Sequence, residues 1–193
     1  MLMNYKKLII TTLIILFANI SCFAMTSKHG LDGNEQYVID AMKNARGHSN
    51  MGNVYFDEGN LISAIKEYEI AYKLTYKTSA SSVYLYNLSR CYIKLKDYKQ
   101  AKIYLEEAIK KDCLNMTYYK TLVDCYVALN IQDEELRKRL DDEINPYSRI
   151  VAGLIFLKTG NKITAKNIFD EFINDNPDML ITDDVRLILK QID

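Results

Sequence analysis

One pattern of small and large residues occurs three times in this 193-residue chain and constrains its fold more than any other feature. Its first copy is Gly52, Tyr55, Gly59, Ala64, Tyr68 and Ala71. Two further copies keep the same intervals: Ser89, Tyr92, Lys96, Ala101, Leu105 and Ala108, then Gly153, Phe156, Gly160, Ala165, Phe169 and Phe172. Self-similarity at such spacing indicates a chain built from repeated structural units.

The intervals within each copy predict a hairpin of two antiparallel helices. Gly52 and Ala64 are expected to face each other where the two helices approach most closely, so both are small. Tyr55 and Tyr68 are large because they fill the space above and below that contact. Only two prolines and seven glycines interrupt the chain, which also favours long helices.

The turn between the two helices has its own residue pattern. Gly59 is expected at the bend, because a positive φ angle costs glycine little. Lys96 takes this place in the middle copy, and Asn60 and Asn161 follow the glycines as expected N-caps of the second helix. Each hairpin leaves one apolar face uncovered, so neighbouring hairpins are expected to stack.

These residues resemble the signature of the tetratricopeptide repeat (TPR) family, over about residues 45–177. The resemblance implies an all-α fold: a right-handed superhelix of stacked antiparallel helix hairpins, closed by a C-terminal capping helix. We expect one TPR domain at residues 35–193, in which residues 35–44 extend the first helix. Its repeats are expected at 45–78, 82–115, 116–145 and 146–179, with the capping helix at 180–192.

The third repeat departs most from the family pattern. Glu135 and Arg139 occupy the positions where alanine and an aromatic residue are expected. Pro146 then ends the helix early, because proline cannot continue it. A distorted hairpin is expected in this repeat.

Residues 1–24 have the layout of a secretory signal peptide. Lys6 and Lys7 precede a mostly apolar run over residues 8–20, and small residues then allow cleavage after Ala24. The predicted location is periplasmic or secreted, and the Ile-, Lys-, Asn- and Tyr-rich composition is typical of a bacterial protein.

Two other readings of this N-terminal segment stay open. The apolar run can act as an uncleaved anchor, or Cys22 can be lipidated to give a membrane-anchored lipoprotein. Asn19 disfavours lipidation, because an aliphatic residue usually stands there. Residues 25–34 are expected to form a flexible segment before the repeats.

The composition points away from catalysis and from nucleic acid. Lys plus Arg and Asp plus Glu both number 25, so there is no basic excess. No nucleophile, phosphate-binding or metal motif is present, so no enzyme activity, cofactor or metal is expected. Cys91 and Cys125 occupy equivalent positions in two repeats and are expected to be buried, whereas Cys113 is expected to be more exposed.

The resemblance also implies where a partner would bind. In the TPR family the first helix of each repeat lines a concave groove. By similarity, the candidate partner-binding residues are Asn53, Phe56, Tyr86, Asn87, Arg90, Lys94, Lys120 and Asp124. Tyr86, Arg90 and Lys94 are spaced by four and form one ridge, and Tyr and Arg are common in binding hot spots. The alternative is a solvated stripe with an unpaired Arg90.

The predicted function is an exported scaffold or adaptor that binds a protein or peptide through this groove. Asn53 and Asn87 match the asparagines of the family's carboxylate clamp for chaperone peptides. Ser49, Thr117 and Thr121 stand where that clamp has basic residues, so that particular ligand is not expected. The alternative function is a structural or self-associating envelope component that docks through the convex face or the C-terminal helix.

Overall fold

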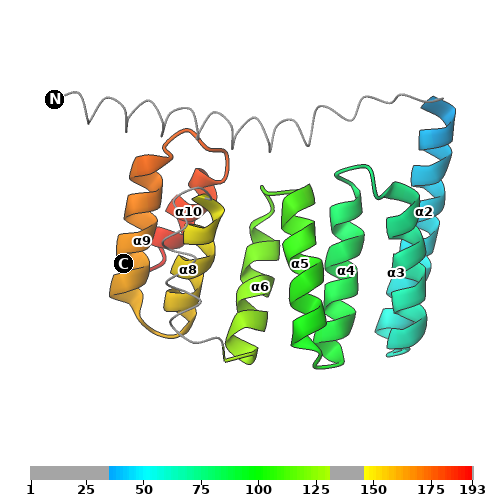
Figure 1. The fold of residues 1–193 in the computed structure, drawn as a ribbon, viewed down its shortest axis with the longest axis horizontal. Coiled ribbons are helices and arrows are strands. Elements are labelled where there is room, and N and C mark those ends of the chain that lie inside the picture. Colours follow the sequence, from blue (N-terminus) through cyan, green and yellow to red (C-terminus); the bar gives the residue numbers. More distant parts are fainter. Residues whose placement is uncertain (1–34, 131–145, 193) are drawn as a thin grey trace. The chain divides into compact units, whose positions relative to one another are not determined.

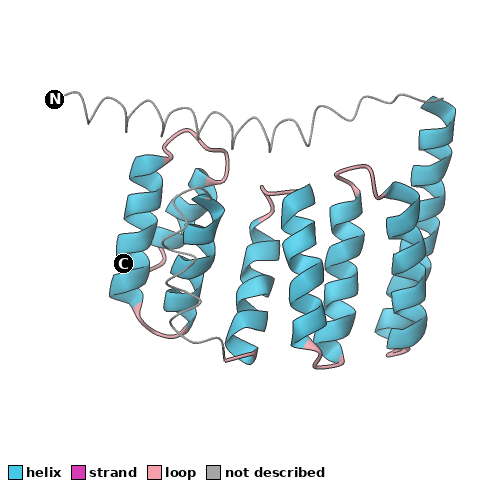
Figure 2. Ribbon diagram, viewed as in Figure 1, coloured by secondary structure: helices cyan, strands magenta, loops and turns pink. Residues whose placement is uncertain are grey.

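The computed structural model describes residues 35–130 and 146–192 (Figure 1). The helices of these ranges are α2 (Glu35–Asp57), α3 (Leu61–Thr75), α4 (Ser81–Lys94), α5 (Tyr98–Lys111), α6 (Met116–Ala128), α8 (Pro146–Lys158), α9 (Lys162–Asp175) and α10 (Thr182–Leu189). Figure 2 shows helices and loops and no strand in this part of the chain, which confirms the all-α prediction. No helix among the described residues is both long and apolar enough to span a bilayer.

The described helices fall into two compact units. In the first unit each helix from α2 to α6 packs on the next one along the chain. In the second unit α8 packs on α9, and α9 packs on α10. The pairs α2–α3, α4–α5 and α8–α9 are the stacked-hairpin elements that the repeat pattern predicts. The expected distortion of the third repeat falls in residues 131–145, outside the described residues.

The turn that closes each hairpin is a left-handed backbone position. Gly59 has a φ of 79° and Gly160 a φ of 89°, which confirms the role predicted for glycine. Lys96 and Asn130 take the same conformation, with φ of 61° and 52°. Asn130 was not expected there, although asparagine tolerates this region better than most residues. One backbone turn therefore recurs at four equivalent positions.

Hydrogen bonds on both sides of the turn explain why it recurs. Gly59 N donates to Phe56 O at 3.2 Å and Asn60 N donates to Tyr55 O at 2.8 Å, so the last carbonyls of α2 are satisfied. Asn60 Oδ1 then accepts from Ser63 N at 3.2 Å and begins α3. The same side-chain bond joins Asn161 to Thr164 N at 3.2 Å. Both predicted N-caps are confirmed.

The close contact inside each hairpin differs from the expected one. A Cβ added to Gly52 would lie 2.6 Å from Cε1 of Tyr68, so this glycine makes room for the tyrosine ring rather than for Ala64. A Cβ added to Gly153 would lie 2.4 Å from Cε1 of Phe169. The small residue is required because the large aromatic side chain of the second helix lies flat against the backbone of the first.

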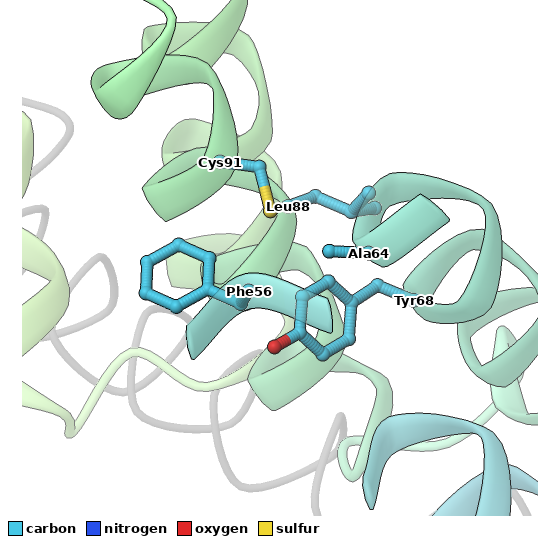
Figure 3. Close-up of a cluster of buried hydrophobic side chains, with 5 residues drawn as sticks. All are labelled: Phe56, Ala64, Tyr68, Leu88 and Cys91. Carbon is cyan, nitrogen blue, oxygen red and sulfur yellow. The ribbon is translucent and has the colours of Figure 1, made fainter. Parts of the chain in front are cut away.

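The first two hairpins stack through a shared core. Figure 3 shows Leu88 and Cys91 of α4 facing Phe56, Ala64 and Tyr68 of the first hairpin, and all five side chains are buried. Burial of this apolar surface is the main force that holds successive repeats together.

The cysteines follow the prediction only in part. Cys91 and Cys125 are fully buried, as expected, and burial raises the pKa of each thiol to about 11. Cys113 is 8% exposed, so it is more exposed than the other two, as expected, but is still buried. The hydroxyl of the fully buried Tyr119 donates to the backbone oxygen of Cys113 at 2.9 Å.

Helix α10 lies within the range predicted for the capping helix. Its apolar side is buried, with Val185 fully covered and Ile188 6% exposed. The connection from α9 is held by Thr182, whose hydroxyl donates to Asn176 O at 2.6 Å. Asp183 and Asp184 lie in the first turn of α10, where negative charge favours the helix dipole.

Candidate functional site

Five of the eight predicted partner-binding residues gather where α2 meets α4. Asn53 and Phe56 come from the last turns of α2, and Asn87, Arg90 and Lys94 from α4. The Cζ atom of Arg90 lies 4.4 Å from the centroid of the Phe56 ring, and Lys94 Nζ lies 3.9 Å from the same centroid. Because Arg90 and Lys94 are one helical turn apart, both reach the same ring. We call Phe56, Arg90 and Lys94 the cation cluster.

The cation cluster is a concentration of positive charge over a buried ring. Phe56 is only 6% exposed, while Arg90 is half-buried and Lys94 is exposed. The negative face of an aromatic ring attracts cations, and each such contact stabilises by about 0.5–1 kcal/mol at exposed sites. Within the described residues neither cation forms an ion pair with a carboxylate. The positive potential of the cluster is therefore available to a ligand.

Backbone and amide groups orient the two cations further. Lys94 Nζ donates to Phe56 O at 3.5 Å, and Arg90 Nη1 donates to Asn87 Oδ1 at a long 3.4 Å. Asn87 is only 7% exposed, so its main role in the site is to orient the Arg90 side chain. The guanidinium of Arg90 thus contacts a ring and an amide but has no ion pair among the described residues, so the alternative of a solvated stripe stays open.

Asn53 borders the cation cluster and is exposed. Its Oδ1 accepts a hydrogen bond from the Tyr68 hydroxyl at 2.7 Å. Burial is the main reason that the pKa of Tyr68 rises to about 12, so the hydroxyl keeps its proton and stays a donor near neutral pH. The bond fixes the orientation of the Asn53 amide and turns its nitrogen toward other acceptors.

The other three candidates lie on α4 and α6. The Tyr86 ring packs against Tyr118, with centroids 5.1 Å apart and planes at 33°. Tyr118 is 2% exposed and its hydroxyl donates to Ser82 Oγ at 3.3 Å. Tyr86 is thus half-buried, and its ring packs on the buried ring of Tyr118. Lys120 and Asp124 are exposed one turn apart on α6.

Sequence reasoning missed the support that these side chains receive. Tyr118 follows no signature position, and only its place beside Tyr119 in an aromatic pair marks it. The contact between Arg90 and Phe56 joins residues of different repeats, so no spacing within one helix reveals it. Within the described residues no group of three or more His, Cys, Asp or Glu side chains forms a possible metal site. His48 Nδ1 instead lies 2.7 Å from Glu67 Oε2 and links α2 to α3.

A protein-family model identifies the kind of repeat. Residues 44–112 match the model of a tetratricopeptide repeat family. No curated protein matches the sequence. Three solved TPR structures that resemble the chain have low sequence identity.

The first is the first TPR domain of Spaghetti (RPAP3) bound to an HSP90 peptide, with 16% identity, a TM-score of 0.43, and coverage of 78% of this chain and 91% of that one. YrrB, described as a TPR protein with an unusual peptide-binding site, has 21% identity and a TM-score of 0.47, over 74% of this chain and 76% of that one. A TPR protein from Parabacteroides merdae has 17% identity and a TM-score of 0.49, over 78% and 60%. Residues 44–112, with the hairpins and turns that they form, are therefore repeats of the tetratricopeptide kind.

Proposed function

We propose that this protein is an exported adaptor that binds a protein segment along the first helices of its repeats, α2, α4 and α6. TPR proteins generally serve as scaffolds for protein–protein interaction. The observation that carries the proposal is the cation cluster. Two cations are fixed over one ring, without a carboxylate partner among the described residues, and beside the exposed amide of Asn53.

The chemistry of this surface favours a peptide with hydrogen-bonding and acidic groups. Arg90 and Lys94 supply charged donors, and the nitrogen of Asn53 supplies a neutral donor. Lys120 adds a further exposed cation on α6, whereas Asp124 limits the total positive charge. Phe56 contributes by holding the two cations rather than by direct exposure. The concave shape of the binding surface is part of this proposal.

Export is a second part of the proposal and depends on residues 1–24. The basic residues followed by an apolar run support a signal peptide. The product would be periplasmic or secreted if cleavage follows Ala24, and membrane-anchored if Cys22 is lipidated. Cell fractionation and mass spectrometry of the N-terminus distinguish these outcomes. An intact N-terminus in the cytosolic fraction contradicts export.

A photo-crosslinking residue at Lys94 tests the binding surface in cells. The matched control carries the same crosslinker at Lys99, an exposed lysine on α5, a second helix of a repeat. We expect a discrete product from Lys94 that Arg90→Glu removes, and no such product from Lys99. Equal labelling at both positions contradicts the proposal. Circular dichroism of Arg90→Glu checks that the helices persist.

The alternative of docking through the C-terminal helix has one observation in its favour. Leu187 on α10 is 56% exposed, and Leu180 just before this helix is 75% exposed. A crosslinked partner at Leu187, with none at Lys94, would support this alternative instead.

A further inference from the structure

The first repeat carries apolar residues at positions that are buried in the next two repeats. Met51 is 48% exposed and Val54 is 50% exposed. The equivalent residues of the following repeats are at most 2% exposed: Leu88, Cys91, Leu122 and Cys125. The same positions are thus apolar in three repeats, but in the first they are half accessible.

The contacts of the second repeat show what these positions do. Leu88 and Cys91 bury themselves against the first hairpin, in the core of Figure 3. Met51 and Val54 present the same half of a stacking interface on α2, at the end of the first unit (Figure 1). Helix α2 therefore has a surface suited to pack against another helix.

Helix α3 also has apolar residues that face away from the second repeat. Its Ile65 and Tyr72 pack toward the second repeat. Ile70 and Leu74 lie about 140–180° around the helix axis from them, given 100° per residue, and so face the opposite way. They are 37% and 38% exposed. We call Met51, Val54, Ile70 and Leu74 the end face.

Gly47 leaves space on α2 for a close helix contact. It lies one turn before Met51 on α2, and a Cβ built on it would meet no atom within 4 Å. Gly52, in contrast, is explained by the Tyr68 ring. Glycine inside a helix is unfavourable relative to alanine, and no close contact within the chain requires it at position 47. The missing side chain leaves room for another helix to approach α2 at this point.

We propose that two copies of the chain associate through the end face, with their α2 helices antiparallel about a two-fold axis beside Met51. In an antiparallel pair centred near residue 51, a residue of one chain meets the residue of the other chain for which the two numbers add up to about 101 or 102. Met51 then meets its own copy, and Val54 of one chain covers Gly47 of the other.

Charge complementarity supports this register. The same arithmetic brings Glu58 of one chain to Lys43 of the other, and the two-fold axis makes this contact twice. Both side chains are exposed and neither has an ion-pair partner within the described residues. Opposite charges at both ends of the helix pair fix its direction.

The second unit favours a two-fold dimer over a head-to-tail chain of copies. Stacking in a row would require a bare face at the C-terminal end to receive the end face. Helix α10 packs on α9 there and buries Val185 and Ile188, so among its apolar side chains Leu187 is the one that is more than half exposed. A two-fold pair uses the same surface from both molecules and closes on itself. It also leaves the cation cluster free, since Phe56 lies about 140° around the axis of α2 from Met51, given 100° per residue.

Sedimentation equilibrium of the purified full chain tests the proposal. We expect a dimer whose dissociation constant rises about tenfold or more in Met51→Glu, which places two carboxylates together on the axis. Ile163→Glu is the matched control, because Ile163 is 78% exposed on α9 and lies outside the end face. A monomer at roughly 100 µM, where weak dimers form, would overturn the proposal and leave the end face to a different protein. Loss of the dimer in Leu187→Glu, with Met51→Glu unchanged, would also overturn it.

Two further variants test the register. Lys43→Glu and Glu58→Lys should each weaken the dimer, and the double variant should restore it. A Met51→Cys chain should form a covalent dimer on mild oxidation, whereas Ile163→Cys should not. Failure of both experiments would overturn the antiparallel arrangement even if a dimer exists. Circular dichroism shows whether each variant keeps its helices.

Discussion

Replacing Gly52 by alanine tests the packing that defines each hairpin. A Cβ at this position would lie 2.6 and 2.8 Å from two carbons of the Tyr68 ring. Carbon atoms normally approach to about 3.5–4.0 Å, so the ring must move by about 1 Å. Tyr68 is fully buried and its hydroxyl is bonded to Asn53 at 2.7 Å, so there is little room for that movement.

The magnitude follows from three contributions. Alanine is favoured over glycine inside a helix by about 1 kcal/mol. Overpacking of a filled core costs about 1–3 kcal/mol. Displacing the ring also weakens the Tyr68–Asn53 hydrogen bond, which contributes about 1 kcal/mol. Gly52→Ala should therefore lower the free energy of unfolding by about 1–3 kcal/mol despite the better helix propensity.

Gly47→Ala is the matched control on the same helix. Its added Cβ meets nothing within the chain, so only the helix propensity changes and the variant should be stabilised by about 1 kcal/mol. Urea unfolding followed by circular dichroism at 222 nm measures both variants, at a concentration where the chain is monomeric. If Gly52→Ala is as stable as Gly47→Ala, the close contact between Gly52 and Tyr68 does not exist in solution.

Three other predictions concern the turns and the thiols. Lys96→Gly should raise the unfolding free energy by about 0.5–1 kcal/mol in a urea titration, because a residue with a side chain is strained at positive φ. Asn60→Ala should lower it by about 1 kcal/mol through loss of the N-cap, and Asn60→Ser should recover most of that loss. Burial raises the pKa of Cys91 and Cys125 from 9.0 to about 11, so the fold favours the neutral thiols. The stability that the two neutral thiols contribute is complete below pH 9 and is lost as the pH rises to 11. The urea midpoint should therefore fall between pH 9 and pH 11. A midpoint that stays constant over this range contradicts the burial of the two thiols.

Much of the fold could be predicted because its signals are local. The hairpin turn requires a positive φ angle and a following N-cap, and both requirements appear as residue types at Gly59 and Asn60. Lys96 stands at the same position of the middle hairpin, so a search for glycine alone would miss that turn. The turn geometry survives there without glycine, because the backbone hydrogen bonds and the cap of Asp97 persist.

The candidate site could be predicted less completely, because its contacts cross between repeats. The spacing of Arg90 and Lys94 placed them on one ridge, but it did not indicate that Phe56 of the previous repeat lies beneath both. Asn87 was assigned to a ligand-facing position and is instead nearly buried. A helical period determines which residues share a face, whereas the packing of the next hairpin determines how much of that face stays accessible.

The recurring left-handed turn has a consequence for how this chain tolerates changes in length. The three described hairpins keep the same interval across the turn, while the connection between α3 and α4 is longer than that between α5 and α6. The connections between hairpins therefore differ in length, whereas the turns within the described hairpins do not. A short epitope inserted among residues 76–80 should be accepted without loss of either neighbouring hairpin, whereas the same insert at Gly59 should separate α2 from α3. The connections between hairpins, and not the turns within them, are therefore the places where the length of this chain can change.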